Sequence, residues 1–323
     1  MTASDDHPAH THRPRPRRRS ALVLVLVLVA GGAAGPPGAR LVSERVASWA
    51  HGEALVVIVE DALPADEPLA WVRAEERRAD AVLVVRWVEA CDRLQVASIP
   101  RDLILDRSGE PLSVIFGTGG TAAVERALAT AFALDIAATV TMDLGDVREV
   151  ADAVGPVEVT LRAPSRDQRT GFAGGPGPVV LDADTAVAYL RSRQWEESRG
   201  GEWVPVAHDD LGRIGREHAY LAAVLTELRG AGLADRVRLG VAVVRHGDAA
   251  IHRHLALVGL VSRLHRASDV EFLTVGVVAE RSVDERRSPF SAGSLGAAHR
   301  FVLAPRQADV FRSDDCPTGA AAP

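Results

Sequence analysis

The stretch that decides the fold is AVLVVRWVEACDRLQVASI, which runs from Ala81 to Ile99. Both of its ends are rich in β-branched and aliphatic residues, and EACD (89–92) interrupts the apolar pattern with charge. Short β-branched runs bounded by polar residues are typical of strands. We therefore predict a hairpin, whose two strands are antiparallel because a short turn joins them.

Further strand and helix patterns alternate on both sides of this hairpin. The predicted strands are ALVVIV (54–59), ATVTMDL (138–144), VEVTL (157–161), LGVAVV (239–244) and VEFLTVGVV (270–278). The predicted helices cover 121–132, 145–155, the segment that follows an N-cap at Asp182, 210–229 and 249–266. Residues 162–180, with GFAGGPGP, predict a flexible loop. Alternation around an antiparallel hairpin predicts an α/β fold, with a mixed, partly antiparallel sheet sandwiched between helices.

The first 52 residues have the composition of an export signal. Five arginines in residues 1–20 precede the apolar run ALVLVLVLVAGGAAG (21–35). As a helix this run spans about 22 Å, against roughly 30 Å for a bilayer core, so a cleaved signal peptide and a signal anchor both stay open. We predict a cytoplasmic leader (1–20), the signal segment (21–35), a linker (36–52), a single extracytoplasmic domain (53–305) and a loose tail (306–323).

The charge balance argues against a nucleic-acid partner. The whole chain carries −6 and residues 1–20 carry +3, from five arginines and two aspartates, so residues 21–323 carry −9. Because nucleic-acid affinity rests on many phosphate contacts, we expect no nucleic acid among the partners. The two cysteines, Cys91 and Cys316, allow one disulfide or two free thiols.

Charged residues gather at predicted strand ends and at one helix start. Asp61 follows the first strand, Asp80 begins the hairpin, and Arg101 with Asp102 follows Pro100. The segment DDLGRIGREH (209–218) places two arginines three residues apart behind an aspartate. On a helix these charges can form ordinary ion pairs worth a few tenths of a kcal/mol, and that interpretation is favoured for this segment alone. The alternative is a clamp for a multiply charged anion.

Five segments, taken together, resemble the LytR-CpsA-Psr family in order and approximate spacing. They are RADA (78–81), VASIPRDL (96–103), DLGDVREVADAVGPVEV (143–159), LDADTAVAYLRSR (181–193) and DLGRIGRE (210–217). The resemblance covers roughly residues 55–228. It implies an extracytoplasmic phosphotransferase that moves a glycopolymer from a polyprenyl-pyrophosphate carrier to a peptidoglycan sugar hydroxyl. It also implies a groove for the lipid tail and Mg²⁺ at the pyrophosphate.

The resemblance assigns roles to matching residues. Asp61 and Asp80 match the family's metal-binding aspartates, and Asp80 or Asp102 is the candidate acceptor for the proton of the attacking hydroxyl. The expected catalytic residues are Asp80, Arg101, Asp102 and Asp210. The expected pyrophosphate-binding residues are Arg78, Arg101, Arg191, Arg193, Arg213, Arg216 and Glu217. Arginine suits this role because its guanidinium stays charged and grips phosphate through two parallel hydrogen bonds.

The chain departs from the family pattern at several positions. Leu63, Ala81 and Ser113 stand where the family usually has an arginine, a threonine and an asparagine. Glu217 stands where the family has glutamine, and its charge would repel pyrophosphate unless it pairs with Arg213 or meets the metal. Two alternatives to the transferase therefore stay open. One is a non-catalytic relative that binds polyprenyl phosphate or a wall polymer, and the other is a pyrophosphatase acting on the carrier.

Overall fold

The computed structural model describes residues 54–60, 78–88, 93–105, 109–206, 210–232, 238, 269–275, 277–281, 299–303 and 311. The leader, signal segment and linker, Asp61, both cysteines, and the predicted elements at 239–244 and 249–266 lie outside these residues. So does all of the predicted tail except Phe311. Within the described part, no helix combines the length and apolarity that crossing a bilayer requires.

Two antiparallel pairings and two parallel ones build the central sheet, whose strand order is β12-β3-β2-β1-β5. β2 pairs antiparallel with β1 and β3, whereas β5 and β12 pair in parallel on the outside. These strands are β1 (Ala54–Glu60), β2 (Ala79–Val88), β3 (Arg93–Ile99), β5 (Ile136–Met142) and β12 (Asp269–Thr274). The mixed sheet predicted from the hairpin is confirmed.

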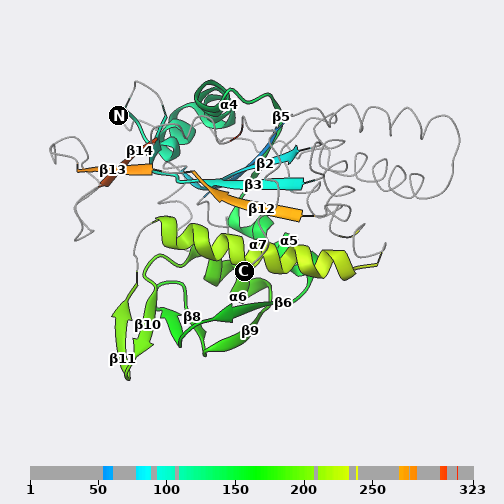
Figure 1. Cartoon of the computed structure of the whole chain (residues 1–323), viewed down its shortest axis with the longest axis vertical. Helices are drawn as coiled ribbons and strands as arrows, with labels where there is room; N and C mark the ends of the chain where they lie inside the picture. Colours follow the sequence, from blue (N-terminus) through cyan, green and yellow to red (C-terminus); the bar gives the residue numbers. More distant parts are fainter. Residues whose placement is uncertain are drawn as a thin grey trace, which may run out of the picture.

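Helix α4 (Leu112–Phe132) covers one face of this sheet (Figure 1). The core between them joins alternate residues of the strands, such as Val56 and Val84, to Leu128 of the helix. α4 is broken at Gly120, whose φ of 63° and ψ of −163° are open to glycine alone. The helical pattern recognised in the sequence starts at Thr121, just after this break, and the structure adds a first segment from Leu112.

A second layer lies on the opposite face of the sheet and contains three of the described helices. They are α5 (Leu144–Val154), α6 (Ala183–Arg191) and α7 (Asp210–Gly230). α7 lies between the sheet and the strands β6 (Val157–Leu161) and β9 (Gly177–Leu181) (Figure 1). Leu221 of α7 packs on the sheet, whereas Tyr220 and Val224 join the core of the second layer. One helix therefore connects two apolar cores.

The prediction of a flexible loop at 162–180 is wrong. This segment contains β7 (Ser165–Asp167), β8 (Phe172–Gly174) and the start of β9. β7 and β8 join β10 (Glu196–Arg199) and β11 (Glu202–Pro205) in a four-stranded sheet ordered β11-β10-β7-β8. Three-residue strands carry too few side chains for a period-two pattern, so the glycines and prolines dominated the prediction.

The C-terminal pattern VEFLTVGVV also divides differently from the prediction. Its first part forms β12, and its end begins β13 (Val277–Arg281) in a separate sheet. That sheet has the order β13-β14-β4, with β14 (His299–Leu303) and the short β4 (Leu103–Ile104).

Candidate functional site

The register of the central hairpin places Asp80 opposite Arg101. Val82 pairs with Ile99. Asp80 lies two residues before Val82 and Arg101 lies two residues after Ile99, so the antiparallel register brings them to the same level. The side chains meet there: Arg101 Nη1 donates to Asp80 Oδ1 over 2.8 Å. The Arg101 carbonyl accepts from the backbone N–H of Ser113, over 2.9 Å, which anchors the turn after β3 to the start of α4. Ser113, a departure from the family pattern, thus contributes through its backbone.

Arg193 brings a second guanidinium to the same carboxylate oxygen. Its Nη2 donates to Asp80 Oδ1 over 2.9 Å, from the loop that follows α6. The side chains of Asp80, Arg101 and Arg193, here called the Asp80 cluster, are 15%, 20% and 32% exposed. The cluster is therefore partly buried but accessible to solvent. Two guanidiniums therefore converge on one carboxylate oxygen, and paired arginines of this kind are suited to binding phosphate.

A buried aspartate that the sequence analysis did not single out holds the loop of Arg193. Asp167 is 1% exposed, and its Oδ2 accepts from the backbone N–H groups of Arg193 and Gln194 over 2.8 and 2.7 Å. Its Oδ1 accepts from the backbone of Arg169 and Thr170 in a turn of its own. The sequence signal was D-x-x-T-G (167–171), an aspartate placed to cap a turn, but nothing local linked it to Arg193.

The first turns of α7 carry a buried ion pair next to the sheet. Arg213 and Glu217, one helical turn apart, form a salt bridge, and both are buried. Glu217 Oε2 also accepts from the hydroxyl of Ser98 on β3, over 3.4 Å. The negative charge of Glu217 is expected to repel pyrophosphate unless it pairs with Arg213 or meets the metal. The salt bridge with Arg213 fulfils the first of these conditions.

His218 extends this network through Ser98. Its Nε2 lies 3.0 Å from Ser98 Oγ, and because that hydroxyl donates to Glu217, the imidazole is the donor in this contact. The ring packs at 5.2 Å from Phe272 of β12, and burial lowers the pKa of His218 below its ordinary value. Neither Ser98 nor His218 was assigned a role from the sequence, because 120 residues separate them.

Arg216 turns away from Arg213 toward the second layer. Its Nη2 donates to the carbonyl of Ser192, the residue before Arg193, and its guanidinium stacks over Trp195 at 4.6 Å. Burial lowers the pKa of Arg216 to about 10, so the group remains a cation at neutral pH. The loop after α6 is therefore held by Arg216, which contacts Ser192, and it carries Arg193, which contacts Asp80.

The other predicted site residues occupy positions around these contacts. Asp102 is 39% exposed, and its Oδ2 lies 3.7 Å from Arg101 Nε. Arg78 immediately precedes β2, and Arg191 is the last residue of α6; both are partly buried. Asp210 is the first residue of α7. The structure thus brings Asp80, Arg101, Asp102 and Arg193 into direct contact, and it links Arg213, Arg216 and Glu217 to their neighbours Ser98 and Ser192.

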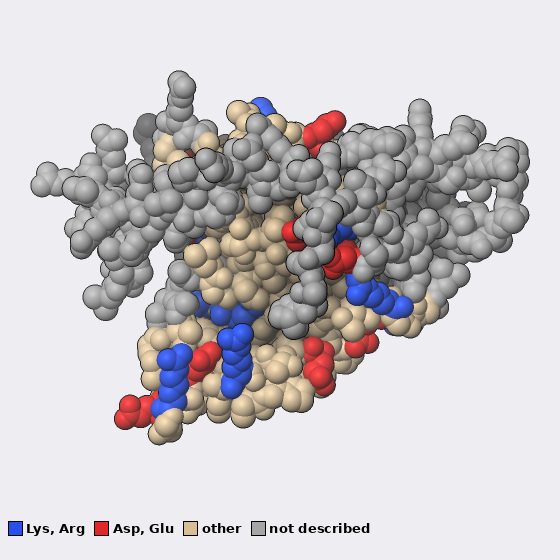
Figure 2. Space-filling model, in the orientation of Figure 1, with Lys and Arg blue, Asp and Glu red and all other residues tan. Residues whose placement is uncertain are grey.

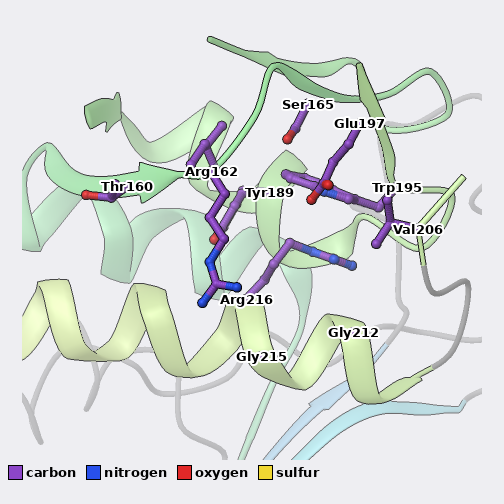
Figure 3. A pocket seen from close by; sticks show the side chains of 11 residues that line it. Thr160, Arg162, Ser165, Tyr189, Trp195, Glu197, Val206, Gly212, Gly215 and Arg216 are labelled. Carbon is purple, nitrogen blue, oxygen red and sulfur yellow. The ribbon is translucent and has the colours of Figure 1, made fainter. Parts of the chain in front are cut away.

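Beside α7 lies a pocket of about 260 Å³, which Figure 3 shows from close by. It is bounded by the end of β6, the end of α6, β10 and the first turns of α7. The lining residues are Thr160, Leu161, Arg162, Ser165, Tyr189, Trp195, Glu197, Val206, Gly212, Gly215 and Arg216. On the face shown in Figure 2, basic side chains lie over this same region, near β10 and the start of α7.

The carboxylates of the site are compatible with a cation held jointly with a ligand. Among the described residues, no group of three His, Cys, Asp or Glu side chains is arranged to hold a metal alone. Both arginines contact Oδ1 of Asp80, so Oδ2 is the oxygen that a cation would meet. Mg²⁺ is usually bound by one or two carboxylates together with phosphate oxygens and water, which such a site can provide.

The fold is a mixed sheet between helices, and Arg101 and Arg193 converge on Asp80 where β3 ends and β2 begins. These features define an α/β protein with a candidate anion site. The LytR_cpsA_psr family model matches residues 63–237, which is more than half of the chain. The protein therefore belongs to the LytR-CpsA-Psr family.

Solved structures share the fold at low sequence identity. A LytR-Csp2A-Psr enzyme from Actinomyces oris is 20% identical, with a TM-score of 0.61, covering 82% of this chain and 89% of that chain. TagT from B. subtilis is 15% identical, with a TM-score of 0.52 and coverage of 80% and 88%. A TagT structure with bound octaprenyl pyrophosphate lipid is 14% identical, with a TM-score of 0.51 and coverage of 80% and 87%. A search of curated proteins finds no match.

Proposed function

We propose that the protein is an extracytoplasmic phosphotransferase, anchored or exported by residues 21–35, that transfers a glycopolymer from a polyprenyl-pyrophosphate carrier to a peptidoglycan sugar hydroxyl. The observation that carries this proposal is the pair of contacts to Asp80 Oδ1, at 2.8 Å from Arg101 and 2.9 Å from Arg193. Family membership supports it, as does the octaprenyl pyrophosphate bound to the structurally similar TagT.

Arg101 and Arg193 form the core of the pyrophosphate clamp in this proposal. Both guanidiniums are already positioned by Asp80, so little side-chain freedom is lost when phosphate oxygens arrive. Each can then donate two parallel hydrogen bonds to a phosphate. Phosphoryl transfer depends mainly on positioning and on neutralising charge spread over the phosphate oxygens, which these two cations supply.

Asp80 is the described residue that would hold Mg²⁺, through Oδ2. The structure places Glu60, the residue before Asp61, opposite Ala79, the residue before Asp80. In this proposal Asp61, which follows Glu60 in the sequence, is the second expected metal-binding aspartate. A bound Mg²⁺ would neutralise pyrophosphate oxygens and restrain the leaving phosphate.

Asp102 is the better placed of the two candidate proton acceptors. Asp80 is occupied by two guanidiniums, whereas Asp102 is more exposed and lies at the edge of the cluster. The acceptor hydroxyl oxygen bonds to the phosphorus that carries the glycan, and its proton passes to Asp102. The bond from that phosphorus to the bridging oxygen breaks, and polyprenyl phosphate leaves with the electron pair.

The test is transfer in vitro from a polyprenyl-pyrophosphate glycan to peptidoglycan fragments with Mg²⁺. Arg101→Ala and Arg193→Ala should each lower the rate at least about tenfold, because each removes a charge-assisted contact to the phosphates. Arg148→Ala is the matched control, since Arg148 also pairs with an aspartate, Asp184, but on the exposed surface of α5 and α6. Equal rates for wild type and both clamp variants would refute the site.

A second candidate function is carrier binding without transfer. The observation that favours it is the buried pair between Glu217 and Arg213, because one clamp arginine is already neutralised. In the same assay, retention of the labelled carrier without product would support binding alone. Release of polyprenyl phosphate without peptidoglycan-linked product would instead indicate the pyrophosphatase.

A further inference from the structure

The pocket beside α7 opens on a different face of that helix from the one that meets the sheet. Gly212 and Gly215 line it, so the helix presents backbone without side chains at two positions of the same face. Arg213 and Glu217 lie on the face that contacts Ser98 of β3. Arg216, which is about 60° round the helix from Arg213, reaches into the pocket instead. The pocket is therefore separate from the Asp80 cluster while sharing a neighbour with it.

Arg216 gives this pocket a buried cation with unused hydrogen-bonding capacity. The residue is 9% exposed and directs one guanidinium nitrogen to the Ser192 carbonyl. Its Nε has no hydrogen-bond partner among the described residues. A buried donor without a partner costs free energy, which an acceptor entering the pocket would recover.

Arg162 supplies a second cation at the pocket mouth. It follows β6, it is exposed, and its side chain extends toward α7 in Figure 3. Among the described residues, no ion pair or side-chain hydrogen bond of Arg162 is found. Glu197, the one carboxylate among the described lining residues, is within 3.4 Å of Arg199. The described residues that line the pocket therefore carry a net positive charge, from Arg162 and Arg216 against Glu197.

The aromatic residues do not offer a free stacking surface. Trp195 is covered on one side by Phe172, in a stacked contact at 5.1 Å, and by the guanidinium of Arg216 at 4.6 Å. Recognition in the pocket therefore rests on charge and hydrogen bonds, from Arg162, Arg216 and the hydroxyl groups of Thr160 and Tyr189. Its volume of about 260 Å³ is below the usual range for drug-sized ligands, roughly 300 to 1,000 Å³, and suits a single sugar residue.

We propose that this pocket binds the oxyanion, a carboxylate or a phosphate, of a single acidic sugar residue. The anion follows from the two arginines, and the sugar rests on the proposed function, in which the substrate is a glycopolymer. The glycopolymer handled by this protein would then carry an acidic residue close to its pyrophosphate end or to its acceptor site.

The test is binding of glucuronic acid, glucose 6-phosphate, inorganic phosphate and glucose to the purified protein, measured by titration calorimetry. We expect one or both acidic sugars to bind, and glucose to bind at least tenfold more weakly. Arg162→Ala should weaken the acidic sugars about tenfold, since it removes one charge-assisted contact. Arg169→Ala is the control, because Arg169 is an exposed arginine of the same segment that does not line the pocket.

Equal affinities of wild type and Arg162→Ala for the acidic sugars would overturn the proposed pocket. Equal affinities for glucose 6-phosphate and inorganic phosphate would overturn the assignment to a sugar. Because Arg162 is exposed, the unfolding midpoint of its variant should match that of wild type. The titration uses neither carrier nor acceptor, so failure of the transfer assay would leave this result standing, and the reverse also holds.

Discussion

Asp167 determines where the side chain of Arg193 can reach, because it holds the backbone of Arg193. Its carboxylate accepts two backbone N–H groups from the loop after α6 and two from its own turn. An asparagine has nearly the same shape but replaces one accepting oxygen with an N–H₂ donor. The two N–H groups that faced that oxygen would then oppose another donor.

Asp167→Asn should therefore lower the free energy of unfolding by about 2 to 4 kcal/mol, as is usual when a buried network loses an acceptor. Urea denaturation measures this change. The control is Asp182→Asn at the exposed N-cap of α6, where asparagine caps as well as aspartate does and little change is expected. Equal losses in the two variants would contradict the role of Asp167.

His218 makes the stability of the protein depend on pH. Burial lowers its pKa, so the folded state resists a proton that the unfolded chain accepts. The stabilisation is complete above the ordinary histidine pKa of about 6.5 and is lost as the pH falls through the lowered value.

Thermal unfolding from pH 7.5 to 5 should show this loss in wild type and a shallower loss in His218→Gln, which keeps a hydrogen-bond donor toward Ser98. The network from His218 to Glu217 stays intact in wild type when the ring is protonated, because Nε2 is already the donor. Parallel pH profiles for the two proteins would show that His218 does not contribute.

At the scale of elements, the break in α4 depends on one glycine. Gly120 has a positive φ, and nothing within 4 Å would obstruct an added Cβ, so the cost of a larger residue is conformational alone. Gly120→Ala should lower the free energy of unfolding by about 1 to 2 kcal/mol. Gly215→Ala, inside α7 and also without obstruction, should raise it by about 0.5 to 1 kcal/mol. Thermal or urea unfolding of both variants distinguishes these opposite signs.

The sequence predicted elements well where one pattern filled a whole strand or helix. β3 and β6 have the bounds that RLQVASI and VEVTL indicated, and Asp182 caps α6 as expected. The three-residue strands β7 and β8 were missed, because their pairing with each other and with β10 depends on segments folded back from elsewhere.

The contacts of the site also divide into those that a local sequence pattern indicates and those that depend on the packing of distant segments. The contact between Asp80 and Arg101 follows from a hairpin that the sequence indicates. The contacts of Asp167 with Arg193 and of Ser98 with His218 depend on how α6 and α7 pack, and no local pattern carries that information. The resemblance to a family located Arg193, whereas the geometry alone located Asp167.

At the scale of the whole molecule, α7 ties two apolar cores together. Leu221 packs on the sheet and Tyr220 belongs to the core of β6, β9 and α6. We therefore expect the two layers to unfold together. Leu181→Ala, which removes a side chain that is 1% exposed in the second layer, should cost about 2 to 5 kcal/mol.

Hydrogen exchange of this variant measures the coupling. Amide protection should fall in β6 and also in β2 and β3 of the central sheet, although Leu181 belongs to the other core. Loss of protection confined to β6, β9 and α6 would show that the layers unfold independently.

The pairing of β2 with β3 also decides which changes in chain length the site can tolerate. An insertion in the connection between Val88 and Arg93 lengthens a turn and leaves Val82 opposite Ile99. An insertion between Ile99 and Arg101 changes the register after β3, so the guanidinium of Arg101 no longer lies opposite Asp80 on β2. Related sequences should therefore vary in length at the turn of this hairpin and keep a constant spacing at its open end.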